Sequence, residues 1–199
     1  PNLIWKGESS EPVIAAAVAG GDQDLAVTIQ IADPVGENVN ASESTAGITS
    51  ALFGTVTGSL SLSAAYSFSG TRKGLGVTAD ATGNVGLLAN TVANGEFTVR
   101  SVDFSNQVVS GGTVKATNGN AGLLVGAFLH VGSLSNVPTA TIESSKGSAG
   151  GVVGKVGSNT GATVEVTSAI DLSNLTVKGT AAAGGFIGQA IKLTLGAEN

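Results

Sequence analysis

Apolar and polar residues alternate along this 199-residue chain in short runs, and no long segment shows the spacing of an amphipathic helix. Alternation over four to eight residues places successive side chains on opposite faces of an extended backbone, so each run predicts a β-strand. Gly, Ser and Asn between the runs are typical of turns. Val13–Ala19 fits either a short helix or a strand. The clearest predicted strands are Leu25–Ile31, Gly76–Asp80, Phe97–Val102, Thr113–Thr117, Thr139–Glu143, Thr163–Thr167 and Leu175–Lys178.

A glycine followed by aliphatic residues recurs five times between the alternating runs. Counted from Gly47, this glycine-aliphatic step returns after 39, 36, 29 and 34 residues. A second marker, a turn-like tetrapeptide with serine in third place, recurs at similar intervals. The steps are Ala46-Gly-Ile48, Gly86-Leu-Leu-Ala89, Gly122-Leu-Leu-Val-Gly126, Gly151-Val-Val-Gly154 and Gly185-Phe-Ile-Gly188, and the tetrapeptides begin at Ser67, Asp103, Ser133 and Asp171.

Two markers that recur together indicate an array of similar units. One unit has too few apolar side chains for a core of its own, whereas stacked units share one. We therefore predict an all-β fold, a right-handed parallel β-helix or solenoid of about four to five coils. In each unit the glycine-aliphatic step is expected to be the third, inward-facing strand. Glycine would suit the corners because it tolerates positive φ and lets backbones approach closely. An antiparallel β-sandwich is the alternative.

Residues 1–46 differ in composition from the rest of the chain. They hold half of the acidic residues against Lys6 alone, giving a charge of about −6, while the remainder is close to +1. We predict that 1–46 is an N-terminal cap or linking segment and that 47–199 is the array. Its predicted units are 47–85, 86–121, 122–150, 151–184 and a partial 185–199.

The steps Ala121-Gly-Leu-Leu-Val-Gly126, Ala149-Gly-Gly-Val-Val-Gly154 and Ala183-Gly-Gly-Phe-Ile-Gly188 resemble the GLUG-type repeat of large bacterial surface proteins, adhesins and secreted proteases. The resemblance spans roughly residues 46 to 189. It implies a right-handed parallel β-solenoid in an extracellular stalk or adhesive region, and it carries no catalytic residue with it.

Composition narrows the classes of partner. The net charge is −5 and the nine Lys and Arg are scattered, which argues against nucleic acid and anionic membranes. The longest uncharged apolar stretch near the start is Val13–Ala19, far below the roughly 20 residues of a spanning helix, so we expect no membrane insertion. Cysteine is absent, which removes disulfides, cysteine-type zinc sites and thiol catalysis. The chain begins without methionine or signal peptide, so we expect a mature or excised segment.

Acidic residues are the only candidates for a metal site. Asp103 and Asp171 occupy equivalent places in the tetrapeptides, so carboxylates on adjacent coils could bind Ca²⁺. Asp22 and Asp24 belong to the densest acidic group in the chain. The alternative for each is structural: Asp caps a turn by accepting a backbone N–H, or lies in a solvated loop.

Catalytic signals are sparse. Glu143 with Glu165, or Asp80 with Asp103, could form the carboxylate pair of a polysaccharide-cleaving β-helix. Trp5 and Tyr66 are the only Trp and Tyr that could stack on sugars, and His130 is the only histidine, which we expect to be structural.

Threonine-rich runs raise an ice-binding alternative. That function needs a flat, regular face of small hydroxyls, which Lys115, Lys178 and Glu143 would interrupt.

The leading expectation is a non-catalytic bacterial cell-surface module, an adhesin or stalk solenoid. The expected partner is a glycan or protein on a host or neighbouring cell, and no cofactor is expected beyond a possible Ca²⁺. The alternatives are a β-helical carbohydrate-active enzyme or depolymerase domain and an ice-binding protein. The sequence leaves the ligand and the oligomeric state open.

Overall fold

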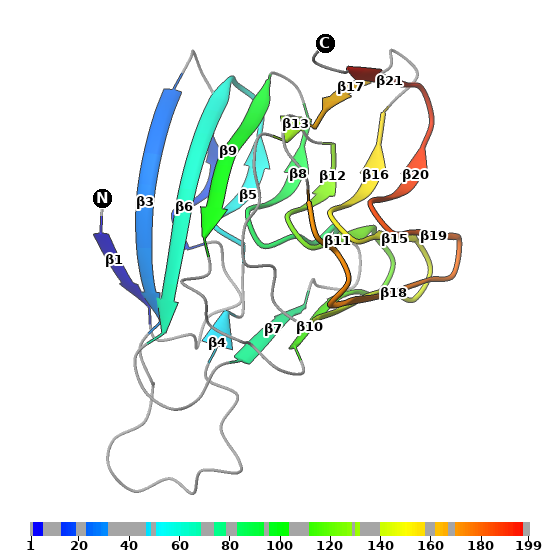
Figure 1. The fold of residues 1–199 in the computed structure, drawn as a ribbon, viewed down its shortest axis with the longest axis horizontal. Coiled ribbons are helices and arrows are strands. Elements are labelled where there is room, and N and C mark those ends of the chain that lie inside the picture. Colours follow the sequence, from blue (N-terminus) through cyan, green and yellow to red (C-terminus); the bar gives the residue numbers. More distant parts are fainter. Residues whose placement is uncertain are drawn as a thin grey trace, which may run out of the picture.

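The computed structural model describes residues 2–5, 13–18, 23–31, 47–48, 51–68, 74–78, 83–93, 96–103, 112–128, 130–131, 140–157, 162–166 and 170–196. These residues form β-strands joined by turns and bends, with no helix among them (Figure 1). The predicted all-β class is therefore confirmed.

The strands belong to five sheets. Sheet I contains β1 (Asn2–Trp5), β3 (Gln23–Ile31), β6 (Leu60–Phe68), β9 (Phe97–Asp103) and β13 (His130–Val131). Sheet II contains β4 (Gly47–Ile48), β7 (Gly74–Thr78), β10 (Gly112–Ala116), β14 (Ala140–Ser144) and β18 (Leu175–Gly179). Sheet III contains β11 (Ala121–Gly122), β15 (Ser148–Gly150) and β19 (Ala182–Gly184). Sheet IV contains β2 (Ala15–Val18), β5 (Phe53–Val56), β8 (Ala89–Val92), β12 (Val125–Ala127), β16 (Val153–Val156) and β20 (Ile187–Ala190). Sheet V pairs β17 (Ala162–Glu165) with β21 (Leu193–Gly196).

The chain visits these sheets in a repeated order. From β8 in sheet IV it passes to β9 in sheet I, β10 in sheet II and β11 in sheet III, and then returns to sheet IV as β12. We call one such pass a circuit. All strand pairs between described residues are parallel, which a sandwich of antiparallel hairpins does not predict.

The residues before β5 continue the same pairing. β2 pairs with β5 in sheet IV, and all nine residues of β3 pair with β6 in sheet I. The segment Val13–Ala19, which the sequence left between helix and strand, contains the strand β2. Part of the predicted N-terminal segment thus shares two sheets with the units that follow.

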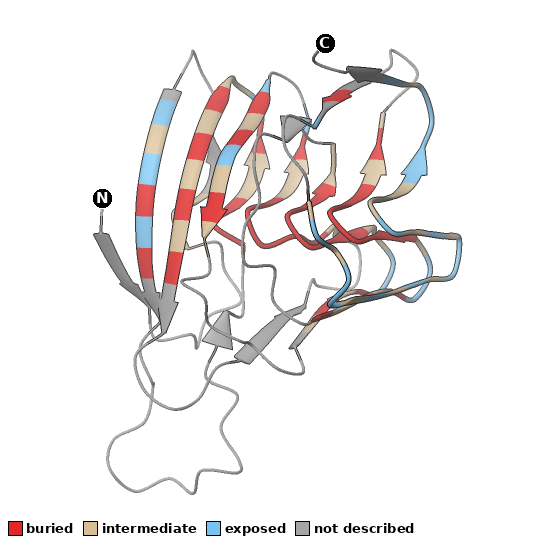
Figure 2. Ribbon diagram, in the orientation of Figure 1, coloured by how far each residue is buried: buried red, intermediate tan, exposed pale blue. Residues whose placement is uncertain are grey.

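The interior is built from aliphatic side chains of successive circuits. Sheet I contributes Leu62 and Val99, and sheet II contributes Val114 and Ile142, all fully buried (Figure 2). Their neighbours along each strand are more exposed, as period-2 alternation requires. Full burial of one such side chain contributes roughly 1.5 to 3 kcal/mol, so the shared interior is the main source of stability.

The glycine-aliphatic step is a corner between two strands, not the third strand that we predicted. Gly122 ends β11, the fully buried pair Leu123 and Leu124 forms a bend, and Val125 begins β12. The prediction that the aliphatic pair faces inward is confirmed, and the prediction that it is a strand is wrong. The pair lies where the chain turns from sheet III into sheet IV.

The strand register aligns three of the five predicted glycine-aliphatic steps differently from the sequence pattern. Gly122 pairs with Gly150, and Gly150 pairs with Gly184, so the last two units align one residue earlier than the sequence pattern indicated. Gly47 lies in β4 and pairs with Gly74 in sheet II. The equivalent corner of that unit precedes Phe53, which pairs with Ala89.

Close backbone approach, rather than positive φ, accounts for the glycines of the step. A Cβ on Gly86 would lie 2.5 Å from the Leu124 carbonyl oxygen, and one on Gly122 would lie 2.7 Å from the Val152 carbonyl oxygen. Real Cβ contacts are essentially never under 3.0 Å. Among the described glycines only Gly157 has a positive φ, so the expectation of positive φ at the corners was wrong.

Circuit length varies in one half of the circuit only. The arc from sheet II through sheet III to sheet IV is nearly constant, whereas the arc from sheet IV through sheet I to sheet II changes by up to eight residues. Measured between register-equivalent residues, the first arc spans 12, 12 and 11 residues in successive circuits: Thr113–Val125, Thr141–Val153 and Thr176–Ile187. The second arc spans 24, 16 and 23 residues: Ala89–Thr113, Val125–Thr141 and Val153–Thr176.

Candidate functional site

The outer face of sheet II carries two aligned rows of polar side chains. Because Val114 and Ala116 are fully buried, the residues that alternate with them lie on the outward face of β10. The register extends this pattern to β14 and β18. The first row is Thr113, Thr141 and Thr176, and the second is Lys115, Glu143 and Lys178.

The charged row alternates in sign along the stack. The Lys115 Nζ lies 3.0 Å from the Glu143 Oε1, and both side chains are partly exposed. An exposed pair of this kind contributes little to stability, up to about 1 kcal/mol. Neighbouring strands lie about 4.8 Å apart, so each row repeats at that spacing. The result is a regular polar surface, the outer face of sheet II.

An arginine at a β-bulge in sheet I reaches across the sheet. The pairing of β6 with β9 shifts by one residue after Leu62, which leaves Arg100 as the extra residue. Its guanidinium forms an ion pair with Asp24 on β3, and its Nε donates a 2.6 Å hydrogen bond to the Ser61 Oγ on β6. The only sequence signal for this bulge is a break in the alternation, because the apolar residues of the run are Phe97, Val99 and Val102, and we predicted an unbroken strand there.

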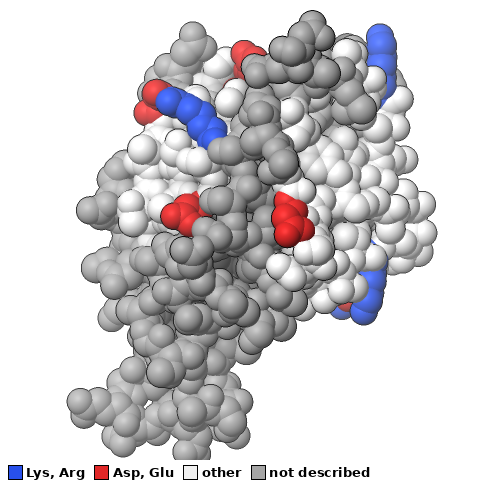
Figure 3. Space-filling view, viewed as in Figure 1, with Lys and Arg blue, Asp and Glu red and all other residues white. Residues whose placement is uncertain are grey.

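Next to this arginine the outer face of sheet I is slightly hollowed. The hollow has a volume of about 500 Å³ and is open to solvent. Small side chains line it, with Asp103 as the one charged residue, and, ion pairs aside, the charged groups of the described residues lie apart from one another in Figure 3. The small lining residues are Ala26, Thr28, Ser63, Ala65 and Ser101.

A ladder of polar side chains occupies the corner between sheets II and III. The Asn84 Oδ1 accepts hydrogen bonds from the backbone N–H and the side-chain amide of Asn120, both at 2.9 Å. One circuit further on, the Asn120 Oδ1 accepts from the Ser148 backbone N–H at 3.1 Å. These groups satisfy the backbone where the strands end, so the ladder is structural.

The three acidic metal candidates that the structure describes, Asp24, Asp103 and Asp171, do not converge. Asp22 lies outside the described residues. Asp24 is paired with Arg100 on sheet I. Asp103 ends β9 and pairs in register with Ala65, whereas Asp171 is exposed in the stretch that precedes β18, so the two do not share a register position.

Asp171 caps a turn. Its Oδ1 accepts a 2.9 Å hydrogen bond from the Ser173 backbone N–H. This hydrogen bond, with a second contribution from the Ser173 side chain, lowers the pKa of the Asp171 carboxyl, because both favour the charged form. The geometry is that of the structural alternative for this residue.

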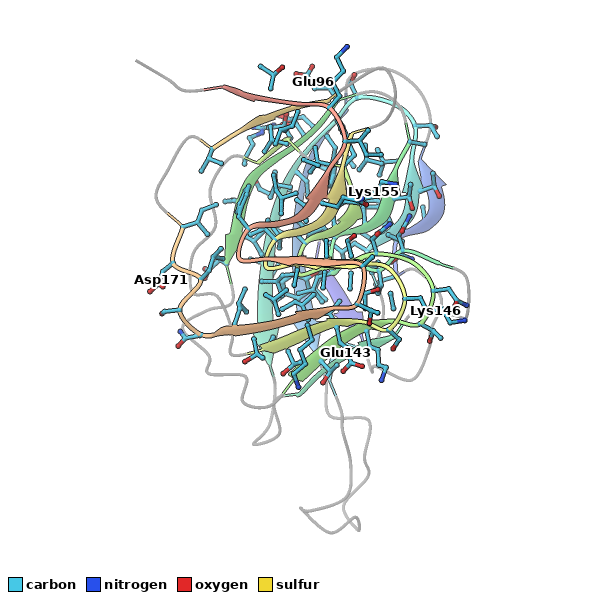
Figure 4. The ribbon with its side chains drawn as sticks, turned by 90° about the vertical axis from the view of Figure 1, so that its right-hand side faces the viewer. Glu96, Glu143, Lys146, Lys155 and Asp171 are labelled. Carbon is cyan, nitrogen blue, oxygen red and sulfur yellow. The ribbon has the colours of Figure 1, made fainter. Side chains whose placement is uncertain are left out.

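The charged residues labelled in Figure 4 lie apart from one another, with Glu96 at the top of this view, Asp171 at the left, Lys146 at the right and Glu143 toward the bottom. Among the described residues, no three His, Cys, Asp or Glu side chains form a group that could hold a metal ion. Glu143 lies on sheet II and Glu165 on sheet V. Asp80 lies outside the described residues, and His130 is in β13 of sheet I.

Comparisons with protein-family models, curated proteins and solved structures find no match to this chain. The resemblance to the GLUG-type repeat therefore stays a prediction. No helix long and apolar enough to span a membrane occurs in the described part of the chain.

Proposed function

We propose that the circuits form a right-handed parallel β-solenoid that acts as a non-catalytic module of a bacterial cell surface. The parallel pairing of successive circuits and their shared apolar interior support the solenoid. Residues 1–46 would form the first turn and cap of the stack. The module would display its outer faces to a partner, as an adhesin or stalk does, in an extracellular setting.

The observation that carries this proposal is the regular polar surface on sheet II. Its alternating Lys115, Glu143 and Lys178 carry a net positive charge, and threonine hydroxyls run beside them. Tyr66 is fully buried, so it cannot stack on a sugar from outside. The matching partner is therefore an acidic surface glycan bound through ion pairs and hydroxyl contacts. Single contacts of this kind are weak, and repetition along a polymer supplies the avidity.

The test compares binding to immobilised acidic and neutral glycans at low and physiological salt. The double variant Lys115→Gln/Lys178→Gln should lose most acidic-glycan binding. The control variant Lys146→Gln/Lys155→Gln removes the same amount of charge away from sheet II (Figure 4). It should retain acidic-glycan binding. Equal loss in both variants would show that net charge, and not this surface, governs binding. If the wild-type chain binds no glycan, the proposed ligand class is wrong.

Ice binding is a second candidate because of one observation, the aligned row of Thr113, Thr141 and Thr176. The charged row lies beside it and would disturb ordered water on the same face. Thermal hysteresis of the wild-type chain, compared with Thr141→Val and with Thr98→Val on sheet I, separates this candidate from glycan binding. Hysteresis that disappears only with Thr141→Val would favour the ice binder.

A further inference from the structure

Lysine occurs at every second position along the charged row of sheet II. Lys115 on β10 and Lys178 on β18 lie on either side of Glu143 on β14. The register position before Lys115 is Thr78 on β7, which is uncharged. Because neighbouring strands lie about 4.8 Å apart, the two lysine positions are about 9.6 Å apart along the stack.

Solvent reaches each of the three charged side chains. The side chains of Lys115 and Glu143 are 42% and 31% exposed, and Lys178 is exposed. An ammonium has three N–H donors and an ionised carboxylate has about four lone-pair sites, so the ion pair between Lys115 and Glu143 leaves both groups able to bind a ligand. The row therefore presents a cation, an anion and a second cation in sequence.

An extended polysaccharide matches this spacing. One extended pyranose unit is about as long as the distance between neighbouring strands, so a polymer that lies along the stack places one sugar over each strand. An anionic group on every second sugar then meets the two lysines. The neutral sugar between them donates hydroxyl or amide hydrogens to the Glu143 carboxylate. Beside the charged row, the threonine row offers hydroxyls that donate to and accept from the same sugars.

A polymer with an anionic group on every sugar fits this row poorly. It would place one of its anions over the Glu143 carboxylate. Two like unit charges about 4 Å apart in water repel enough to lower affinity about fivefold. Charge density alone favours this polymer, because it brings more anions to the lysines. The two explanations therefore predict opposite orders of affinity.

We infer that the outer face of sheet II recognises a polysaccharide in which an anionic sugar alternates with a neutral one. The polymer lies across β10, β14 and β18, with its anionic groups at Lys115 and Lys178 and a neutral sugar at Glu143. The inference rests on the proposed function, which requires an acidic glycan, and adds the spacing of its charges. In this arrangement the lysines supply the attraction and Glu143 sets the specificity.

Titration calorimetry with hyaluronan and heparin oligosaccharides of equal length tests the inference. Hyaluronan has a carboxylate on every second sugar, whereas heparin has an anionic group on every sugar. The wild-type chain should bind hyaluronan more tightly, although heparin carries more charge. Glu143→Gln keeps the size of the side chain and removes its charge, so affinity for heparin should rise about fivefold without a matching gain for hyaluronan. The matched control Glu96→Gln, at an exposed residue on the far side of Figure 4 from Glu143, should change neither affinity.

The outcomes separate this inference from the proposed function. Tighter binding of heparin, lost in Lys115→Gln/Lys178→Gln, would overturn the alternating pattern and leave the proposed function in place. Unchanged heparin affinity in Glu143→Gln, with circular dichroism showing a native fold, would overturn the specificity role of Glu143. If neither polymer binds, or if Lys115→Gln/Lys178→Gln binds both like the wild type, the proposed function fails together with the inference.

Discussion

Alanine at Gly151 and alanine at Gly185 should have opposite effects on stability, although the two glycines are equivalent in adjacent circuits. At Gly151 the new Cβ would overlap the Gly185 carbonyl oxygen, so the two circuits must separate locally. Three hydrogen bonds cross this junction: Gly151 N–H to Gly184 O at 3.0 Å, and Val152 N–H and Val153 N–H to Phe186 O at 2.9 and 3.0 Å.

The magnitude follows from these contacts. Overpacking typically costs about 1 to 3 kcal/mol, and each weakened hydrogen bond adds about 0.5 to 1.5 kcal/mol. With one of the three hydrogen bonds weakened, we therefore expect Gly151→Ala to lower the free energy of unfolding by about 1.5 to 4.5 kcal/mol. Gly185→Ala meets no atom of the described residues within 4 Å and restricts the unfolded chain, so it should be neutral or stabilising by about 0.4 to 1 kcal/mol.

Urea denaturation followed by far-ultraviolet circular dichroism measures both values. The slope of the free energy against urea should be the same in both variants and the wild type, which shows that the same surface unfolds. If the two variants differ by less than about 0.5 kcal/mol, the explanation of the step by backbone approach is refuted.

Three further predictions concern the interior and the corner ladder. Leu124→Ala should lower the free energy of unfolding by about 2 to 5 kcal/mol in the same urea assay, because Leu124 is fully buried and its loss leaves a cavity. Asn120→Ala should cost about 1 to 3 kcal/mol in thermal or urea unfolding, because it removes the acceptor of the Ser148 N–H. Burial raises the pKa of the Tyr66 phenol above its ordinary value of 10.0, so only the unfolded chain loses this proton just above pH 10. Stability should therefore be unaffected by Tyr66 below pH 10 and fall by up to about 1.4 kcal/mol per pH unit above it, and Tyr66→Phe should lack this decrease.

The strands were the most predictable part of the fold, because period-2 alternation is a local property. Phe97–Val102 was predicted and β9 is Phe97–Asp103, while Thr139–Glu143 was predicted and β14 is Ala140–Ser144. The inward direction of the aliphatic pair was also correct. These features depend on which face of a strand is buried, and the positions of the apolar residues along the strand indicate that face.

Register and bulges were not predictable, because they depend on the neighbouring circuit. The repeated Gly-Gly allows two alignments of this unit with Gly122. The sequence pattern predicted Gly151 as the equivalent residue, whereas the strand pairing aligns Gly150 with Gly122. Arg100 is the unpaired residue at the bulge in β9 and forms an ion pair with Asp24 two strands away, a contact that depends on the register of three circuits. The candidate site was not predicted as a site: the sequence indicated Lys115, Glu143 and Lys178 only as interruptions of a threonine face, and the register places them in one row.

The uneven circuit length determines where this protein can accept foreign sequence. Between sheets IV and II, natural circuits already differ by up to eight residues, so a peptide epitope grafted between β9 and β10 should leave the interior intact. From sheet II to sheet IV the spacing is nearly fixed, because the corner packs backbone against backbone. An insertion there would displace every later strand. One side of the molecule is thus open to diversification, as in a display scaffold, and the other side is closed to it.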